Sequence, residues 1–230
     1  MSTYCKELFS LIDLSKTFTQ GSTVHEVLSG INFDFHRGKS YAITGESGTG
    51  KSTLLYLLAG LDQPTSGSIL FNGRPLNNLD KEARLHHARY ERGIIVQFPS
   101  LIQELTVMEN CILPALIAGT SHDHAQERAV SLLKAVGLED KLHSVPDTLS
   151  GGQQQRACVA RALVNNPVVI LADEPTANLD PVTGQQVIDI LLDCCRKQGV
   201  TVIMSTHDSN VSRQVEVHLV LEGKKLVKKP

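Results

Sequence analysis

The chain has 230 residues, of which 41% are hydrophobic and 20% charged, and its formal net charge is −2. This length suits one domain, divided at most into subdomains, that folds without disulfides. The near-neutral charge argues against a broad nucleic-acid-binding face, so we expect no nucleic-acid partner. The basic cluster of Lys224, Lys225, Lys228 and Lys229 is interpreted as a solvated tail, with a contact to acidic lipid headgroups as the alternative.

Cysteine usage and apolar runs bear on where the protein works. The five cysteines are odd in number, form no C-x-x-C pair and fit buried thiols in a reducing compartment; they are Cys5, Cys111, Cys158, Cys194 and Cys195. The N-terminal residues lack the pattern of a signal peptide. The most apolar segments, 111–119 and 167–172, fall far short of the roughly 18 residues that a membrane span needs. We therefore expect a protein that serves a membrane only by docking onto a partner.

The first predicted elements are strands. Val24–Leu28 and Ile31–His36 are predicted to form a hairpin, and Ser40–Thr44 is a buried-type strand. That strand runs into a glycine-rich loop, which opens an apolar helix from Lys51 to Leu61. Further on, Ser68–Phe71 is predicted as a strand that ends in an Asn-Gly turn. The hairpin and this strand together predict a small antiparallel layer.

The glycine-rich loop has the G-x-x-x-x-G-K-S pattern of a phosphate-binding loop. Its residues are Gly45, Glu46, Ser47, Gly48, Thr49, Gly50, Lys51 and Ser52. The glycines allow successive backbone N–H groups to face an anion, and the positive end of the following helix faces the same point. We expect Lys51 to reach the β- and γ-phosphates of a nucleotide and the Ser52 hydroxyl to ligate magnesium.

The middle of the chain, from about residue 98 to 164, has a mostly helical pattern. Thr106 and Glu109 have the spacing of a capping box, and a helix from Asp123 to Val136 is predicted to end at Gly137. Strands return at Val168–Ala172 and Thr201–Ser205, and between them Asp180 and Pro181 begin a helix that Gly199 closes. The sequence therefore predicts an α/β core with a parallel sheet, interrupted by a helical insert.

The strand at 168–172 ends in two acids, Asp173 and Glu174. A buried strand has little reason to end in two carboxylates unless a cation or a reacting water lies beyond it. Asp173 suits a magnesium ligand, and Glu174 could orient and deprotonate the attacking water. An acidic loop without catalytic function is the alternative, which the nearby phosphate loop makes less attractive.

The segment Leu149–Arg156 reads LSGGQQQR. Ser150 and Gln153 fit a capping box, and Gly151 and Gly152 leave backbone N–H groups bare at another helix N-terminus, which is a second potential anion site. A capped helix without a ligand is equally consistent with local physics. This octapeptide resembles the signature motif of ATP-binding-cassette (ABC) proteins, and nearly the whole chain follows the order of that family.

The resemblance implies the P-loop NTPase fold of an ABC ATPase. A RecA-like parallel-sheet core with a small antiparallel β-subdomain would span residues 1–97 and 165–230, and an α-helical subdomain would span 98–164. Phe18 matches the aromatic residue that stacks on adenine, and Gln97 matches the Q-loop. Asp180 lies in the D-loop, and His207 matches the switch histidine, for which a structural histidine is the alternative.

The resemblance also assigns roles to residues. Implied catalytic residues are Glu174, His207 and Gln97, and implied magnesium ligands are Ser52, Gln97 and Asp173. Implied ATP-binding residues are Phe18, the loop from Gly45 to Ser52 with Thr53, the signature residues Ser150, Gly151, Gly152 and Gln153, and Asp180. Two copies would pair head to tail with ATP between the loop of one and the signature of the other. ATP and Mg²⁺ are thus the expected cofactors.

Within the family, several stretches resemble the branch of lipoprotein-releasing (Lol-type) and macrolide-exporter (MacB-type) ATPases. They are 59–62, 64–67, 106–110, 162–167 and 171–180. Two departures are Ala177, where glycine is usual, and the segment after the Q-loop, 98–104. The implied function is the ATPase subunit of a bacterial ABC transporter, peripheral on the cytoplasmic face of the inner membrane and bound to integral membrane permease subunits, with lipoprotein release or export as its role.

Two other classes of protein are alternatives. A non-transport ABC ATPase, such as a cell-division regulator, shares the same branch and stays open, whereas ribosome and DNA-repair types usually carry a second cassette or long inserts that this chain lacks. An ordinary P-loop kinase or GTPase is disfavoured by the signature at 149–156.

Overall fold

The computed structural model describes residues 6–21, 23–76 and 79–229, so Cys5 lies outside the described residues. Within these ranges the larger sheet has six strands. In spatial order they are β10 (Lys225–Lys228), β9 (Val217–Glu222), β3 (Ser40–Thr44), β8 (Thr201–Ser205), β7 (Val169–Asp173) and β6 (Arg92–Ile95). Neighbouring strands are parallel except for β10, which is antiparallel to β9. The predicted α/β fold with a parallel sheet is confirmed.

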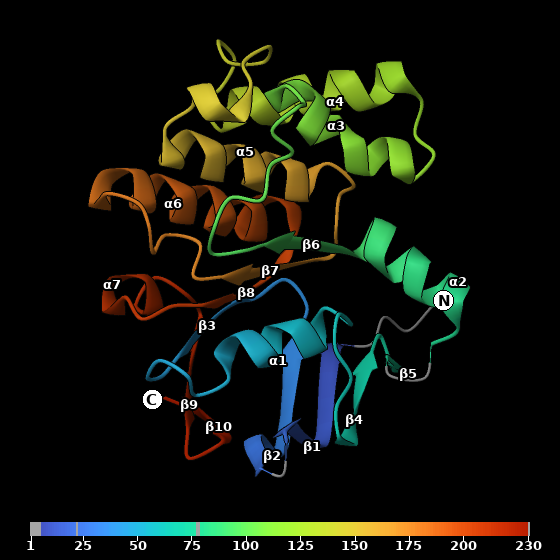
Figure 1. The fold of residues 1–230 in the computed structure, drawn as a ribbon, viewed down its shortest axis with the longest axis vertical. Coiled ribbons are helices and arrows are strands. Elements are labelled where there is room, and N and C mark those ends of the chain that lie inside the picture. Colours follow the sequence, from blue (N-terminus) through green and yellow to red (C-terminus); the bar gives the residue numbers. More distant parts are fainter. Residues whose placement is uncertain (1–5, 22, 77–78, 230) are drawn as a thin grey trace.

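A second sheet is antiparallel, as predicted. Its order in the described chain is β2 (Thr23–His36), β1 (Glu7–Gln20), β4 (Ser66–Phe71) and β5 (Arg74–Pro75). The turn between β4 and β5 contains Asn72 and Gly73, both at positive φ, as the Asn-Gly prediction requires. This sheet forms the outer layer at the bottom of Figure 1.

The predicted hairpin of Val24–Leu28 with Ile31–His36 is wrong. Both segments belong to the single strand β2, which pairs along its length with β1. Between the pairs Leu14–Ile31 and Lys16–Leu28, two residues of β2 oppose one of β1, and Gly30 adopts a φ of 53°. Ser29 and Gly30 therefore form a β-bulge rather than a chain reversal. A Ser-Gly pair is compatible with a turn or with a bulge. The pairing of β2 with β1 on both sides of the pair makes it a bulge.

Helices pack on both sides of the larger sheet (Figure 1). In chain order they are α1 (Lys51–Leu58), α2 (Lys81–His86), which continues as the π-helical turn η1 (His87–Glu91), α3 (Val107–Ile117), α4 (His122–Ala135), the short turn η2 (Pro146–Thr148), α5 (Gly151–Leu163), α6 (Pro181–Gln198) and α7 (Ser209–Ser212). Helix α1 lies between the two sheets, α5 and α6 cover the opposite face of the larger sheet, and α3 and α4 pack on α5.

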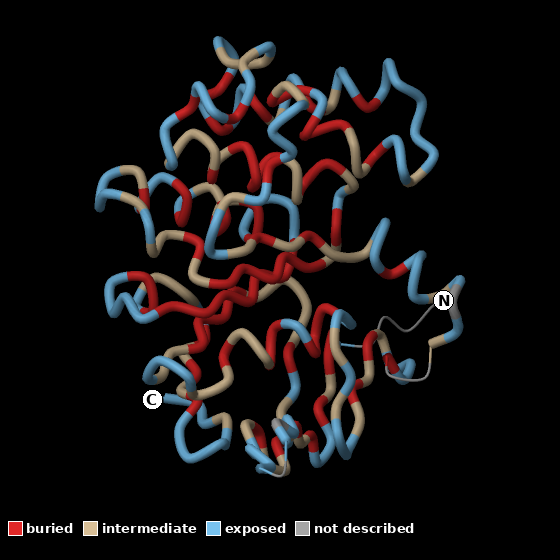
Figure 2. Tube along the Cα trace, in the orientation of Figure 1, coloured by how far each residue is buried: buried red, intermediate tan, exposed pale blue. Residues whose placement is uncertain are grey.

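Alternation along the strands explains these layers. On β7, Val169 and Leu171 pack with α1 and the antiparallel sheet, whereas Ile170 and Ala172 pack with α5 and α6. Side chains of a strand point alternately to opposite faces, and a strand covered on both faces is apolar throughout. Figure 2 shows this sheet as the most continuously buried part of the molecule. A third apolar cluster lies among α3, α4 and α5.

The predicted helix boundaries are close to those observed. Thr106 with Glu109 and Ser150 with Gln153 both form reciprocal capping boxes, at the starts of α3 and α5. The side chain of Asp180 caps α6, and Gly199 ends that helix in the left-handed conformation. Helix α1 ends at Leu58, three residues earlier than predicted. These signals lie within four residues of each helix end, which is why the sequence was sufficient to predict them.

The lysines of the basic C-terminal cluster are exposed to solvent, as predicted, but the cluster is not a free tail, because Lys225–Lys228 forms β10 at the edge of the larger sheet. The Nζ atom of Lys224 lies 3.1 Å from a carboxylate oxygen of Glu26, and Lys225 donates to the carbonyl oxygen of Gly30. Both contacts tie this strand to β2. This strand was not predicted, because four of the six residues at 224–229 are lysines and only Leu226 and Val227 are apolar.

The described cysteines agree with the prediction of buried thiols. Cys111, Cys158, Cys194 and Cys195 are all buried and unbridged. Burial raises the pKa of the Cys111 thiol to about 12 and that of Cys195 to about 11, so both are protonated at neutral pH. Among the described helices, none is both long and apolar enough to span a bilayer.

Candidate functional site

The loop between β3 and α1 is held in a conformation that requires glycine. Gly45, Gly48 and Gly50 have φ values of 151°, 80° and 104°, which L-residues rarely adopt. A Cβ atom on Gly45 would lie 2.5 Å from the carbonyl oxygen of Leu221, and one on Gly50 would lie 2.4 Å from a methyl carbon of Val27. The backbone therefore passes closely between β9 and β2, and its N–H groups are placed at the start of α1.

Lys51 is the first residue of α1 and is only 9% exposed. Its Nζ atom donates to the carbonyl oxygens of Gly45 and Glu46, at 2.9 Å each. The side chain thus folds back over the loop, and its charge lies at the positive end of the helix. An ammonium group has three donors, so this geometry leaves one to meet an incoming phosphate oxygen.

The carboxylates of Asp173, the last residue of β7, and of Glu174, the next residue, have different partners. Asp173 is buried, and its Oδ1 atom accepts a hydrogen bond from Ser205 Oγ at 2.6 Å. Glu174 has a φ of 46°, and its backbone N–H donates to the same serine oxygen at 2.9 Å. The Oε2 atom of Glu174 lies 2.8 Å from Nδ1 of His207. Ser205 therefore fixes the backbone turn that separates the two carboxylates.

These groups meet around one cleft of about 550 Å³. Its lining combines the loop and the start of α1 with residues that follow three strands of the larger sheet. The lining residues are Val27, Gly45, Ser47, Gly48, Gly50, Lys51, Ser52, Thr53, Gln97, Glu174 and His207. Parallel strands end at the same sheet edge, which is why residues more than 100 positions apart converge here.

Several residues assigned to the site by resemblance lie outside this lining, among them Glu46, Thr49, Asp173, Phe18 and Asp180. Phe18, on β1, is 44% exposed, with Nζ of Lys16 4.9 Å from the ring centroid. Asp180 caps α6 and borders a neighbouring cleft that also contains His207. Hydrogen bonds from the side chain and backbone of Thr183 hold the pKa of Asp180 below its usual value.

The signature residues Ser150, Gly151, Gly152 and Gln153 are not among those that line the cleft. Ser150 and Gly151 are exposed, and a Cβ atom on Gly151 would meet no heavy atom within 4 Å. Gly152 is different, since a Cβ atom there would lie 2.3 Å from a methyl carbon of Thr183 on α6. The start of α5 is therefore fixed against α6 and still presents bare backbone to the surface.

The oxygen donors near the cleft fit magnesium. Ser52 and Gln97 line it, and Asp173 lies at the end of β7 with Oδ1 engaged by Ser205, which leaves Oδ2 as a donor. Hydroxyl, amide and carboxylate oxygens are hard ligands, and Mg²⁺ is usually bound by few protein groups together with water and phosphate oxygens. No cluster of three or more His, Cys, Asp or Glu side chains suited to a metal occurs in the described part of the chain.

Sequence reasoning missed two residues that organise the site. Ser205 holds both acids, as described above. Lys16 is 9% exposed and donates to Asp62 Oδ1 and to the carbonyl oxygen of Gln63, both at 2.7 Å, while lying beside the Phe18 ring. The position of Lys16, two residues before Phe18 on one strand face, was a usable signal for this contact.

A strand, a phosphate loop, a helix and two acids at the end of β7, which is separated from β3 by β8, define a P-loop nucleotide-binding protein. The family model described as ABC transporter matches residues 28–177. An uncharacterized ABC transporter ATP-binding protein of Mycobacterium tuberculosis is 44% identical over 220 residues, which cover 96% of this chain and 89% of that protein. The chain therefore belongs to the ABC transporter family, as an ATP-binding subunit with ATPase activity.

Solved structures agree with this assignment. The ATP-binding cassette MJ0796, a dimer in a post-hydrolysis state with ADP and Pi bound, is similar with a TM-score of 0.90 and 35% identity, covering 96% of this chain and 97% of that one. CbiO1 from Clostridium perfringens, part of the ABC transporter complex cbiONQ, has a TM-score of 0.85 and 28% identity, covering 97% and 88%. The expected ABC ATPase fold is confirmed.

Proposed function

We propose that this chain hydrolyses ATP as a head-to-tail dimer and drives a separate membrane permease. The observation that carries the proposal is the division of the phosphate-binding groups. One cleft gathers Lys51, Gln97, Glu174 and His207, whereas the bare helix start at Gly151 lies outside it. A second copy would supply its own Gly151 region to close the cleft. The dimeric cassette MJ0796 and the complex that contains CbiO1 support such partners.

In this proposal the phosphates of ATP lie on the backbone N–H groups of the loop 45–53, with Lys51 against the β- and γ-phosphates. Phe18 stacks on adenine, with its other face occupied by Lys16. Mg²⁺, held by Ser52, Gln97 and Asp173, would neutralise charge on the phosphates. Binding at the loop uses groups of the one chain, so the monomer is expected to bind ATP.

Glu174 is proposed to accept a proton from the attacking water. His207, at 2.8 Å, holds this carboxylate in place and lies where it can also contact the γ-phosphate. Asp180 borders the cleft next to His207 and would connect the two sites of a dimer. Gln97 would sense the γ-phosphate and pass its presence to the helical region that follows it. Its carbonyl oxygen also accepts from Asn178 at 3.2 Å, which joins it to the segment that carries Asp180.

We further propose residues 98–164 as a helical subdomain and 1–97 with 165–230 as the core, and a peripheral position at the cytoplasmic face of the membrane. Within the family we propose the lipoprotein-releasing and exporter branch. The stretches at 162–167 and 171–180 support that branch. The segment 98–104 departs from it, so the identity of the permease is the part that needs experiment most.

The test uses Glu174→Gln. Glutamine keeps the size of the side chain and a hydrogen bond to His207 but removes the base. We expect ATP affinity to be unchanged, hydrolysis to fall by roughly 10²–10⁴-fold, and ATP to hold the variant as a dimer. Phosphate release measures hydrolysis, and light scattering with and without ATP measures the dimer. Glu139→Gln, an exposed residue far from the cleft in sequence, is the matched control.

Near-normal hydrolysis by Glu174→Gln would remove this residue from its proposed role. The same variant, loaded with ATP, then serves to identify partners from membranes. Co-purification of an integral membrane protein with a large extracytoplasmic domain is the result expected for the lipoprotein-releasing or exporter branch. Recovery of only soluble partners would contradict the transport proposal and leave the ATPase assignment standing.

A further inference from the structure

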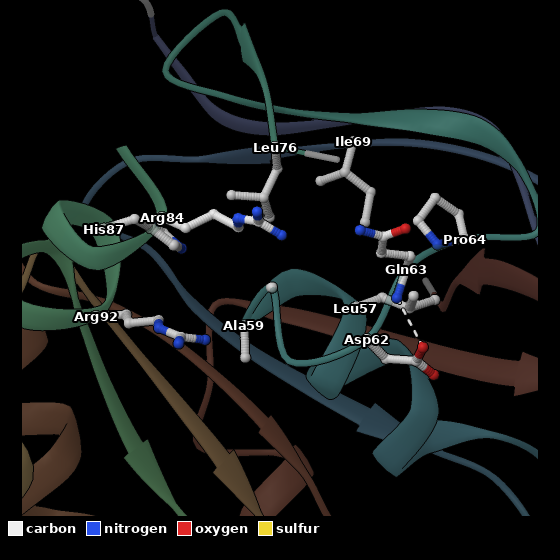
Figure 3. Close-up of a pocket in the computed structure, with 11 residues that line it drawn as sticks. Leu57, Ala59, Asp62, Gln63, Pro64, Ile69, Leu76, Arg84, His87 and Arg92 are labelled. Carbon is white, nitrogen blue, oxygen red and sulfur yellow. Dashed lines mark hydrogen bonds between the residues drawn. The ribbon is translucent and has the colours of Figure 1, made fainter. Parts of the chain in front are cut away.

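A second cavity lies at the other end of α1 from the nucleotide cleft (Figure 3). The turn after α1, with Ala59 and Gly60, forms one side. Three basic residues face it from separate elements: Arg84 from α2, His87 from η1 and Arg92 from the start of β6. In Figure 3 the guanidinium groups of both arginines point into this space. Helix α1 has eight residues, which separates the cavity from the start of the phosphate loop helix by about 12 Å along the axis.

Two of these residues have buried nitrogen atoms without a hydrogen-bond partner. His87 is 3% exposed, its Nδ1 atom lies 3.1 Å from Glu91 Oε2, and its Nε2 atom has no hydrogen-bond partner. The Nε and Nη1 atoms of Arg92 are likewise buried and unpartnered. Burial lowers the pKa of Arg92 to about 10. Buried polar groups of native proteins are nearly always paired, so the unpaired guanidinium N–H groups of Arg92 beside a cavity need a partner from outside the chain.

The carboxylates nearby do not satisfy these donors. Asp62 lines the cavity, but its Oδ1 atom accepts from Lys16 Nζ and from the backbone of Gln63, both at 2.7 Å. Glu91 is engaged by His87, and that contact is the main reason its pKa is lowered. The cavity therefore carries excess positive charge.

The size of the cavity limits the ligand. It measures about 40 Å³. On this measure one water needs about 10–15 Å³, so there is room for about three waters or for one small tetrahedral anion. A nucleotide or a peptide would not fit inside.

We propose that this cavity binds one phosphate-type oxyanion, held by Arg92 and Arg84, with Nε2 of His87 as a third donor when its ring is protonated. Guanidinium groups match the geometry of phosphate oxygens, and a fully ionised partner makes the strongest hydrogen bonds available to them. The anion links α2 and η1 to the end of α1 and thereby braces the helix that begins with Lys51. Free inorganic phosphate and the phosphate of a lipid headgroup offer the same chemistry.

The test measures thermal unfolding of the whole chain with a non-hydrolysable ATP analogue saturating the nucleotide cleft. Inorganic phosphate is compared with chloride at equal ionic strength. We expect phosphate at about ten times its dissociation constant to raise the unfolding midpoint of the wild type by about 3–6 °C. Arg92→Met removes the buried guanidinium and keeps a long side chain. It should show no phosphate-dependent rise and should unfold no earlier than the wild type in chloride.

Arg84→Met, at an exposed position, should fold normally and lose part of the rise. Arg196→Met on α6, also exposed, is the matched control and should keep all of it. A parallel sedimentation with vesicles of phosphatidylcholine and phosphatidylglycerol separates the two sources. If the ligand is a lipid phosphate, the wild type should bind the vesicles and Arg92→Met should not. If the ligand is free phosphate, vesicle binding should be the same for both proteins. Equal behaviour of wild type and Arg92→Met in both assays would overturn the proposal, because it would leave only a general salt effect.

Discussion

The starts of α1 and α5 are both glycine-flanked helix N-termini suited to bind an anion, but their surroundings differ. At α1 the ends of the loop, at Gly45 and Gly50, pass closely by β9 and β2, and Lys51, Gln97, Glu174 and His207 border the same cleft. At α5 the capping box of Ser150 and Gln153 satisfies part of the helix end, and Gly151 faces open space. In the proposed mechanism the first end binds the phosphates with groups of one chain alone. The second end offers backbone N–H groups and the hydroxyl of Ser150, whose oxygen accepts from the Gln153 N–H.

This difference gives a physical reason for a dimer. A helix N-terminus attracts phosphate through its unpaired backbone N–H groups and the helix dipole. Placing a second copy opposite the cleft would put the two kinds of helix end on either side of one nucleotide. Binding and hydrolysis should then depend on different ends, and the variants below separate them.

The largest effect is expected at the first end. Lys51→Ala removes a buried ammonium group and both of its loop contacts. ATP affinity should fall by at least about 100-fold, since a charge-assisted contact to phosphate in a partly buried site is among the strongest hydrogen bonds. Fluorescence titration with a labelled ATP analogue measures the change. Undiminished affinity would mean that this loop is not the phosphate site.

A second effect should appear in hydrolysis alone. Gly151→Asp places a negative charge at the exposed start of α5, where a Cβ atom meets no neighbour. The monomer should fold and bind ATP as the wild type does, whereas dimerisation and hydrolysis should fall by about 100-fold through repulsion of phosphate. Gly151→Ala is the neutral comparison. A loss of ATP affinity in the Gly151→Asp monomer would contradict the division between the two helix ends.

The smallest effect is expected at Ser205, whose hydroxyl contacts both Asp173 and Glu174 beside the cleft. Ser205→Ala leaves the Glu174 N–H and a buried oxygen of Asp173 without their partner. The free energy of unfolding should fall by about 1–3 kcal/mol. The rate of hydrolysis should fall by about tenfold, and ATP affinity should be unchanged. Chemical denaturation and phosphate release measure these two changes. Ser212→Ala, a buried serine with a local bond to Ser209, should leave hydrolysis unaltered.

What the sequence predicted well depends on short segments. The phosphate loop, the capping boxes and the glycine that ends α6 are each encoded within a few residues, because they satisfy the backbone of one helix end. The strands around 40–44, 169–173 and 201–205 were also predictable, since a parallel sheet buried on both faces demands continuous apolar runs. The family signature added the roles of residues, which local physics at Ser150 does not distinguish from an ordinary cap.

Tertiary structure decided what depends on pairing between distant segments. Whether Ser29 and Gly30 turn the chain or form a bulge was settled by β1, and the lysine-rich terminus became a strand because β9 offered it a free edge. The contact of Glu174 with His207, the support from Ser205 and the convergence of Arg84, His87 and Arg92 likewise join residues from different elements. Such contacts leave no spacing rule in the sequence, because the fold alone brings their segments together.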